Sequence, residues 1–301
     1  MKKIFKRISI FILVTTLIAT CAFSLFACNR KKGLPDVDYR LDNDYNALTL
    51  TLDVPSEISN SLSVKIYYPE NVNARYGFLF FVGTFISAEY YDYLGNALAK
   101  QGYIAAIPNV LVNATYAYYT QETKVASERI QELYPNVKFF VGGHSQGGGA
   151  AMRFACEKLD NVAGAIFMSP LCYPAHECAI EEYNAYGTAH PEWFTQENSG
   201  DYLRFDTLAN TTLPVLLLEA DRDHVLNDEQ KNDARVRMPA SMMHYVLSPA
   251  SHMSFSGMDG DAYEKSLNND GEGMTQEEKE AQKRQTVNYI LDFLQITVAN
   301  L

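Results

Sequence analysis

The segment that decides the fold is Phe139-Phe140-Val141-Gly142-Gly143-His144-Ser145-Gln146-Gly147-Gly148-Gly149-Ala150-Ala151. An apolar run precedes the serine and small residues follow it, so we expect a strand, a sharp turn at Ser145 and then a helix. Such a turn strains the serine backbone, and side chains at Gly143 and Gly147 would collide with neighbouring elements. The amino terminus of the helix directs free N–H groups at the serine, where they would stabilise an oxyanion. The segment is therefore typical of a nucleophilic serine.

Apolar runs alternate with amphipathic stretches along the rest of the chain. This alternation predicts an α/β fold, with a mostly parallel eight-stranded sheet flanked by helices. The first two strands show the polar and apolar alternation of an antiparallel pair. We expect strands at 48–52, 63–68, 78–82, 103–107, 139–141, 163–168, 215–218 and 245–247, and helices at 89–101, 122–134, 146–158, 228–235 and 275–294.

Residues 171–213 separate the sixth and seventh expected strands by more than a loop normally spans. We interpret them as a cap insertion. Cys172 and Cys178 are close enough in sequence for a disulfide in an exported protein, and a free pair of thiols is an equal alternative. The insertion is rich in aromatic residues, which either line an apolar acyl or aryl pocket or form its own small core: Tyr173, Tyr183, Tyr186, Trp193, Phe194, Tyr202 and Phe205.

A serine hydroxyl needs a base to take its proton, and a carboxylate to orient that base. In α/β folds that place a nucleophilic serine between a strand and a helix in this way, the acid follows the serine in sequence and the histidine follows the acid. Of the late histidines we favour His252, which lies in a loop after the last strand, over His244, which lies in or beside that strand. For the acid we favour Asp223, in the turn after the seventh strand, with Asp221 as its closest competitor.

Two backbone amides are needed to bind the oxyanion. One should belong to Gln146, directly after the serine, and the other to the loop after residues 78–82. That loop reads Gly83-Thr84-Phe85, so we expect the Thr84 amide, with Phe85 as the alternative.

The amino terminus carries an export signal. Basic residues precede the uncharged run 8–27, and Leu25-Phe26-Ala27-Cys28 resembles the lipobox of bacterial lipoproteins. We expect residues 1–27 to be a signal peptide, Cys28 to be lipidated, 28–45 to be a tether and 46–301 to be one domain. The protein would then be anchored to the outer face of a bacterial cell membrane. An uncleaved transmembrane anchor is the alternative, and Cys21 is a weaker lipidation site because Thr20 precedes it.

Composition excludes several classes of partner and cofactor. The 301 residues carry a formal net charge of -11, which argues against binding to nucleic acid. Five cysteines are too few for a disulfide scaffold. The acidic loop with Asp259, Asp261 and residues 268–272 misses the spacing of an EF-hand, so we expect it to be solvated and to hold no calcium. The serine chemistry requires no metal and no cofactor.

Residues 78–294 resemble the α/β-hydrolase superfamily, and within it the small bacterial hydrolases related to dienelactone hydrolase and secreted esterases. The resemblance includes 93–103, the serine turn, 214–225 and Ser251-His252 before a long loop and closing helix. The chain departs from common members at Val82-Gly83, where a His-Gly pair is usual, and in its long insertion.

The resemblance implies the triad of Ser145, Asp223 and His252 and a carboxylic ester hydrolase that acts on small acyl substrates. A peptidase or amidase with the same triad is an alternative. A binding lipoprotein that kept the fold without the chemistry is another.

Overall fold

A computed structural model describes residues 47–53, 61–69, 73–84, 86–109, 121–158, 161–172, 206–258 and 269–301, all of which belong to the unit Tyr39–Leu301. For 47–53, 61–62 and 121–125 only the backbone is described. The expected signal peptide, Cys28 and the tether lie outside this part of the chain, as does most of the expected cap. No helix among the described residues has both the length and the apolar character needed to cross a membrane.

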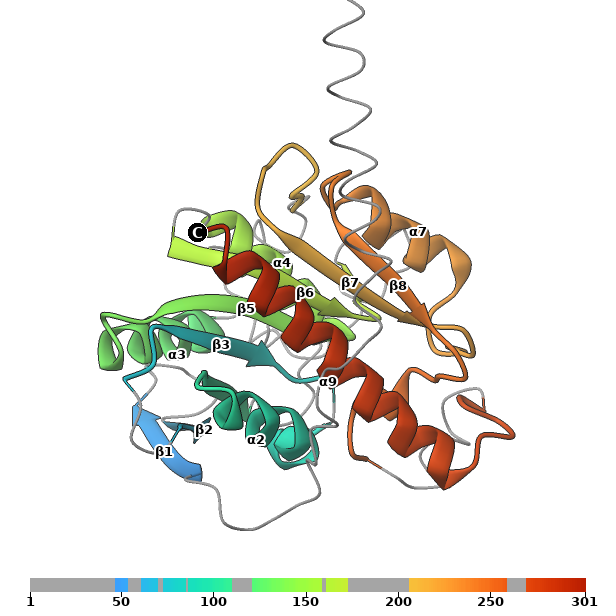
Figure 1. The fold of residues 1–301 in the computed structure, drawn as a ribbon, viewed down its shortest axis with the longest axis horizontal. Helices are drawn as coiled ribbons and strands as arrows, with labels where there is room; N and C mark the ends of the chain where they lie inside the picture. Colours follow the sequence, from blue (N-terminus) through green and yellow to red (C-terminus); the bar gives the residue numbers. More distant parts are fainter. Residues whose placement is uncertain are drawn as a thin grey trace, which may run out of the picture. The chain divides into compact units, whose positions relative to one another are not determined.

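Eight strands form one sheet in the order β1-β2-β4-β3-β5-β6-β7-β8 (Figure 1). The first three in this order pair antiparallel, and all the other neighbours pair parallel. The predicted mostly parallel, eight-stranded α/β sheet is therefore confirmed. The strands are β1 (Ala47–Asp53), β2 (Ser61–Tyr67), β3 (Tyr76–Phe81), β4 (Ile104–Asn109), β5 (Lys138–His144), β6 (Val162–Met168), β7 (Val215–Ala220) and β8 (Met243–Leu247).

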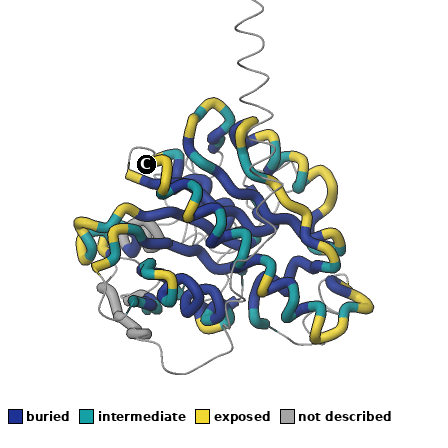
Figure 2. The backbone as a smooth tube through the Cα atoms, in the orientation of Figure 1, coloured by how far each residue is buried: buried dark blue, intermediate teal, exposed yellow. Residues whose placement is uncertain are grey.

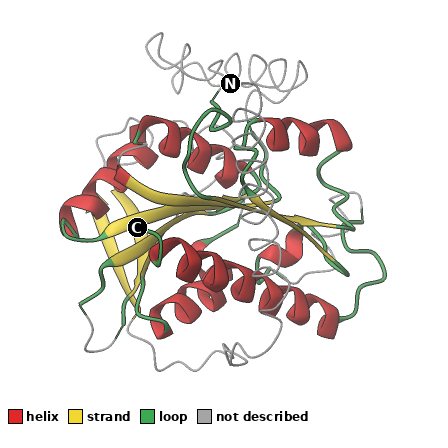
Figure 3. Cartoon of the chain, turned by 45° about the horizontal axis from the view of Figure 1, so that its top comes forward, coloured by secondary structure: helices red, strands yellow, loops and turns green. Residues whose placement is uncertain are grey.

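Helices cover both faces of the sheet (Figure 3). Among them, α2 and α9 contact each other, and Figure 1 shows α9 crossing the sheet diagonally on that side. Capping boxes fix where α7 and α9 begin: the side chains of Asn227 and Thr275 accept the N–H of the third helical residue, and that residue's side chain accepts in return. The helices are α2 (Asp92–Lys100), α3 (Gln121–Leu133), α4 (Gln146–Glu157), α7 (Asp228–Val236) and α9 (Gln276–Val298), with short 3-10 turns η1 (Ala88–Tyr91) and η5 (Met253–Phe255).

The central strands are buried on both faces, as their continuous apolar sequences predict (Figure 2). Phe80, Phe140 and Phe167 from three neighbouring strands are fully buried. Phe293 of α9 packs edge-on against Phe140, with ring centroids 6.1 Å apart. This packing fixes the sheet as a rigid support for the loops at its edge.

Two element boundaries differ from the sequence prediction in an informative way. The expected helix 89–101 starts as the η1 turn and becomes α-helical only at Asp92. Strand β5 continues past residue 141 to His144, so the strand runs directly into Ser145. Gly142 and Gly143 have low strand propensity, so the sequence did not predict that β5 includes them. Close packing requires glycine at both positions.

Candidate active site

Ser145 lies between β5 and α4, in a backbone conformation that few residues adopt. Its φ and ψ are 55° and -125°, a strain of about 1–3 kcal/mol that the surroundings must hold in place. Its N–H donates to the Met168 carbonyl at 3.1 Å, and its own carbonyl accepts from the N–H groups of Gly148 and Leu171 at 2.9 and 2.8 Å. The backbone of the serine is thus fixed on both sides, and its half-buried side chain lies at the carboxyl end of β5.

The two glycines that flank the serine permit this turn. A Cβ atom at Gly143 would lie 2.1 Å from the Gly147 carbonyl oxygen, and one at Gly147 would lie 2.2 Å from the Phe81 carbonyl oxygen. Both obstacles are backbone atoms, which cannot rotate away. Glycine at these positions brings the start of α4 against the end of β3, where the expected oxyanion loop begins.

Asp223 follows β7 and is bound at both carboxylate oxygens. Oδ1 accepts the N–H groups of Val225 and Leu226 at 3.0 and 2.9 Å. Oδ2 lies 2.9 Å from Nδ1 of His252. Burial alone would raise the pKa of Asp223, but the charge and hydrogen bond of His252 and the Leu226 amide outweigh it and hold the pKa well below its usual value. Asp223 is therefore ionised at neutral pH and holds His252 by Nδ1.

His252 lies in the loop after β8, directly before η5, with only 1% of its surface exposed. The structure thus brings two of the predicted residues, Asp223 and His252, into direct contact. No hydrogen bond joins the Ser145 hydroxyl to the His252 ring, although both residues are described; such contacts are often long in unliganded sites. The ring of His144, the residue before Ser145, lies with its centroid 4.7 Å from that of His252.

The competing residues have other partners. Asp221 accepts the Ser248 hydroxyl and the Ala250 N–H at 2.5 and 2.8 Å, and contacts neither histidine. His244 lies on β8 as predicted and contacts Glu219 through Nε2. The geometry therefore favours Asp223 over Asp221, and His252 over His244.

The two residues expected to bind an oxyanion lie together. The Thr84 hydroxyl donates to the side-chain carbonyl of Gln146, which joins the loop after β3 to the first residue of α4. The Gln146 amide, in the first turn of a helix, has no acceptor within that helix. The Gly83 N–H donates to the Tyr91 hydroxyl at 3.1 Å, so this amide of the loop is already bound within the fold. The alternative, Phe85, lies outside the described residues.

Sequence reasoning missed a buried pair beside this loop. The Tyr91 hydroxyl lies 2.8 Å from Nδ1 of His144, and it also accepts the Gly83 N–H. Burial lowers the pKa of His144 well below its usual value, with His252 adding to the shift, so the ring is neutral at pH 7. A neutral ring lets the tyrosine O–H donate to Nδ1. A tyrosine in the first turn after the oxyanion loop is a weak signal that no sequence pattern singles out.

Within the described residues, no group of three or more His, Cys, Asp or Glu could hold a metal ion. Burial raises the pKa of the Cys172 thiol to about 12, which makes it unreactive at neutral pH. Its possible partner Cys178 lies outside the described residues, as do the seven aromatic residues of the insertion and residues 259–268 of the acidic loop.

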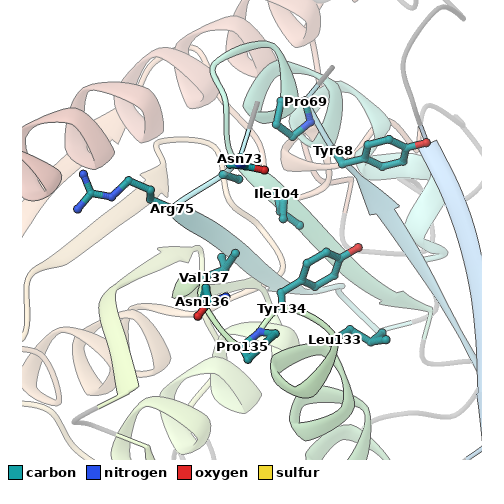
Figure 4. A pocket seen from close by; sticks show the side chains of 11 residues that line it. Tyr68, Pro69, Asn73, Arg75, Ile104, Leu133, Tyr134, Pro135, Asn136 and Val137 are labelled. Atoms are coloured by element: carbon teal, nitrogen blue, oxygen red, sulfur yellow. The ribbon is translucent and has the colours of Figure 1, made fainter. Parts of the chain in front are cut away.

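A hollow of about 730 Å³ opens at the other end of the sheet (Figure 4). Its walls come from the segments before β3 and β5 and after β2, whereas Ser145, Asp223 and His252 follow the carboxyl ends of β5, β7 and β8. Much of the wall is exposed side chains, and Arg75 extends away from the other labelled residues in Figure 4. The hollow therefore is no part of the serine site.

Comparison with known proteins agrees with this architecture. A family model described as "Alpha/beta hydrolase family" matches residues 77–187, which include Ser145. No curated protein matches the chain significantly.

Among solved structures, the esterase domain of a Rhodothermus marinus protein is similar with a TM-score of 0.51, at 14% identity, over 75% of this chain and 99% of that one. An S-formylglutathione hydrolase from Agrobacterium tumefaciens has a TM-score of 0.47 at 14% identity, over 67% of this chain and 85% of that one. A dienelactone hydrolase from Anabaena variabilis has a TM-score of 0.46 at 14% identity, over 75% and 94%.

Proposed function

Since the chain has the α/β-hydrolase fold, we propose that it is a serine hydrolase that cleaves carboxylic esters through an acyl-enzyme intermediate. The observation that carries the proposal is the buried 2.9 Å contact between His252 Nδ1 and Asp223 Oδ2, in loops that follow the same sheet edge as the strained Ser145. Esterase and dienelactone hydrolase activities belong to the structural neighbours, and they suggest the substrate class.

In this mechanism His252 is the general base. Asp223 holds Nδ1–H, so Nε2 carries the lone pair that takes the Ser145 hydroxyl proton. The serine oxygen attacks the ester carbonyl, and the Thr84 and Gln146 amides bind the oxyanion. His252 then gives its proton to the departing alcohol, which leaves Ser145 acylated. Water, deprotonated by the same histidine, releases the acid and restores the serine.

We place the enzyme outside the cytoplasm, held to the outer face of the cell membrane by acyl chains on Cys28. The support is the basic, apolar and lipobox-like sequence of residues 1–28. Incorporation of labelled palmitate into wild type, and its loss in Cys28→Ala, would support the anchor. Incorporation that survives Cys28→Ala would exclude this site.

A fluorophosphonate probe tests the central proposal, because it reacts only with an activated serine. Wild type should be labelled and Ser145→Ala should not, with equal thermal stability of the two as the control. A folded wild type that resists labelling would refute the enzyme and favour a binding lipoprotein.

To distinguish esterase from amidase, p-nitrophenyl esters of short and long chains should be compared with p-nitroanilides. Faster anilide cleavage would favour the peptidase or amidase.

A further inference from the structure

Asp270 is a buried carboxylate that contacts two loops of the candidate site. These are the acid loop after β7, which carries Asp223, and the histidine loop after β8, which carries His252. Its Oδ1 accepts the N–H groups of His224 and His252 at 3.1 and 3.2 Å, and its Oδ2 accepts the N–H of Met253 at 2.8 Å. Only 1% of its surface is exposed. One of these amides directly follows Asp223 in sequence, and the other two belong to the histidine loop. A single side chain therefore spans both loops.

The backbone around Asp270 is shaped for this contact. Asn269 and Gly271 on either side have positive φ values of 55° and 69°, which turn the chain sharply at Asp270. A Cβ atom at Gly271 would lie 2.9 Å from the Ser251 side chain, so this turn packs tightly on the histidine loop. The Asn269 carbonyl lies 3.2 Å from Nδ1 of His224 on the acid loop. The turn is thus wedged between the two loops.

We propose that Asp270 is a positioning residue, whose carboxylate sets the spacing between Asp223 and His252. The proposal rests on the proposed function, because it assigns the purpose of this spacing to the serine reaction. The acid loop also holds the histidine loop at Ala250, because Asp221 accepts its N–H at 2.8 Å and the Arg222 N–H donates to its carbonyl at 2.9 Å, but these contacts do not involve His252. Gln282 of α9 binds the backbone of Ser251 at both N–H and C=O, each at 2.8 Å, without touching the acid loop.

The number of acceptor oxygens at residue 270 matters, and this makes the proposal testable with a substitution of equal size. Three donors face the two oxygens, and a carboxylate accepts all three. A carboxamide has one oxygen, so Asp270→Asn must turn its NH₂ group toward either Met253 N–H or the pair of amides at Oδ1. A donor facing a buried donor is unfavourable, and the loops must move apart to relieve it.

The test compares Asp270→Asn with Glu219→Gln, a control that weakens another buried carboxylate. Glu219 accepts Arg235 at two oxygens and contacts no amide of the two loops. We expect Asp270→Asn to lose roughly tenfold to a hundredfold in kcat and in the fluorophosphonate reaction rate, with KM nearly unchanged, because small misplacements of a catalytic group have effects of this size. Glu219→Gln should lose stability with nearly unchanged kcat. Equal kcat in wild type and Asp270→Asn would overturn the proposal.

Two further measurements test the proposal without relying on activity or on the stability of the variant. The low-field proton signal of His252 Nδ1–H should be present in wild type and lost or shifted in folded Asp270→Asn, even if the protein proves to be no hydrolase. If Asp270→Asn does not fold, hydrogen exchange of the wild type decides. The amides of His224, His252 and Met253 should be protected to a common degree, because one carboxylate holds all three. Unequal protection would overturn the proposal.

Discussion

Replacing Asp223 with asparagine separates the two tasks of its side chain. Oδ1 closes the turn through the N–H groups of Val225 and Leu226, and Oδ2 holds His252 Nδ1. The carboxamide oxygen will occupy the Oδ1 position, because the opposite orientation would aim NH₂ at two buried N–H donors. Its NH₂ then donates to Nδ1 of His252. The imidazole proton must move to Nε2, so this nitrogen loses the lone pair that would accept the serine proton.

The expected loss in kcat is about 10⁴-fold, the size associated with a wrong imidazole tautomer in a serine triad. It corresponds to about 5 kcal/mol of transition-state stabilisation. Stability should fall by only about 1–2 kcal/mol, since every polar atom keeps a partner and one charged hydrogen bond becomes neutral. The fold and the catalytic effect are therefore separable in one variant.

The assay is p-nitrophenyl ester hydrolysis with urea unfolding of the same samples. Asp221→Asn is the matched control: Asp221 also accepts a backbone amide of the histidine loop, but it does not contact His252. Asp221→Asn should keep kcat within about tenfold of wild type, as expected for a residue that holds the histidine loop without contacting His252. If Asp223→Asn keeps more than a tenth of the wild-type kcat while Asp221→Asn loses activity, the assignment of the acid is wrong.

Three further predictions follow from the same site. Gly147→Ala should lose about 3 kcal/mol of stability in urea unfolding, at the upper end of overpacking costs, because the new methyl would meet the Phe81 carbonyl at 2.2 Å; unchanged stability would contradict the packing argument. His252→Ala should abolish ester hydrolysis and His244→Ala should preserve it, and the reverse result would move the base to β8. The lowered pKa of Asp223 stabilises the folded state above the unfolded value of about 4, and this contribution is lost as pH falls through the folded pKa. The difference in unfolding free energy between wild type and Asp223→Asn should accordingly shrink from pH 6 to pH 3, and a constant difference would refute it.

The strands were predictable because buried parallel strands are apolar throughout and are bounded by turn residues. The serine turn was predictable because its glycines are required by backbone contacts within a short segment. The order of the sheet was not, since β2 pairs with β4 rather than with its successor β3. Pairing of this kind depends on side chains distant in sequence.

Some contacts of the candidate site could be predicted from the sequence, and others could not. Asp223 and His252 could be selected because each follows a strand in a known order, although their roles stay predictions. Tyr91 and His144 are 53 positions apart in the sequence, and the contacts of Asp270 span up to 46 positions. No local sequence pattern marks the side chains that make these contacts. An acidic residue in a polar loop resembles any solvated residue until the fold buries it.

Two buried residues within the expected cap 171–213, Cys172 and Asp206, contact the same arginine. The Asp206 carbonyl accepts from the guanidinium of Arg237, and the Asp206 carboxylate pairs with Arg153 at 3.0 Å. Arg237 is also close enough to Cys172 to oppose the rise in the pKa of its thiol. A single buried guanidinium therefore couples two points of the chain that lie far apart in the sequence, and its loss would release both at once.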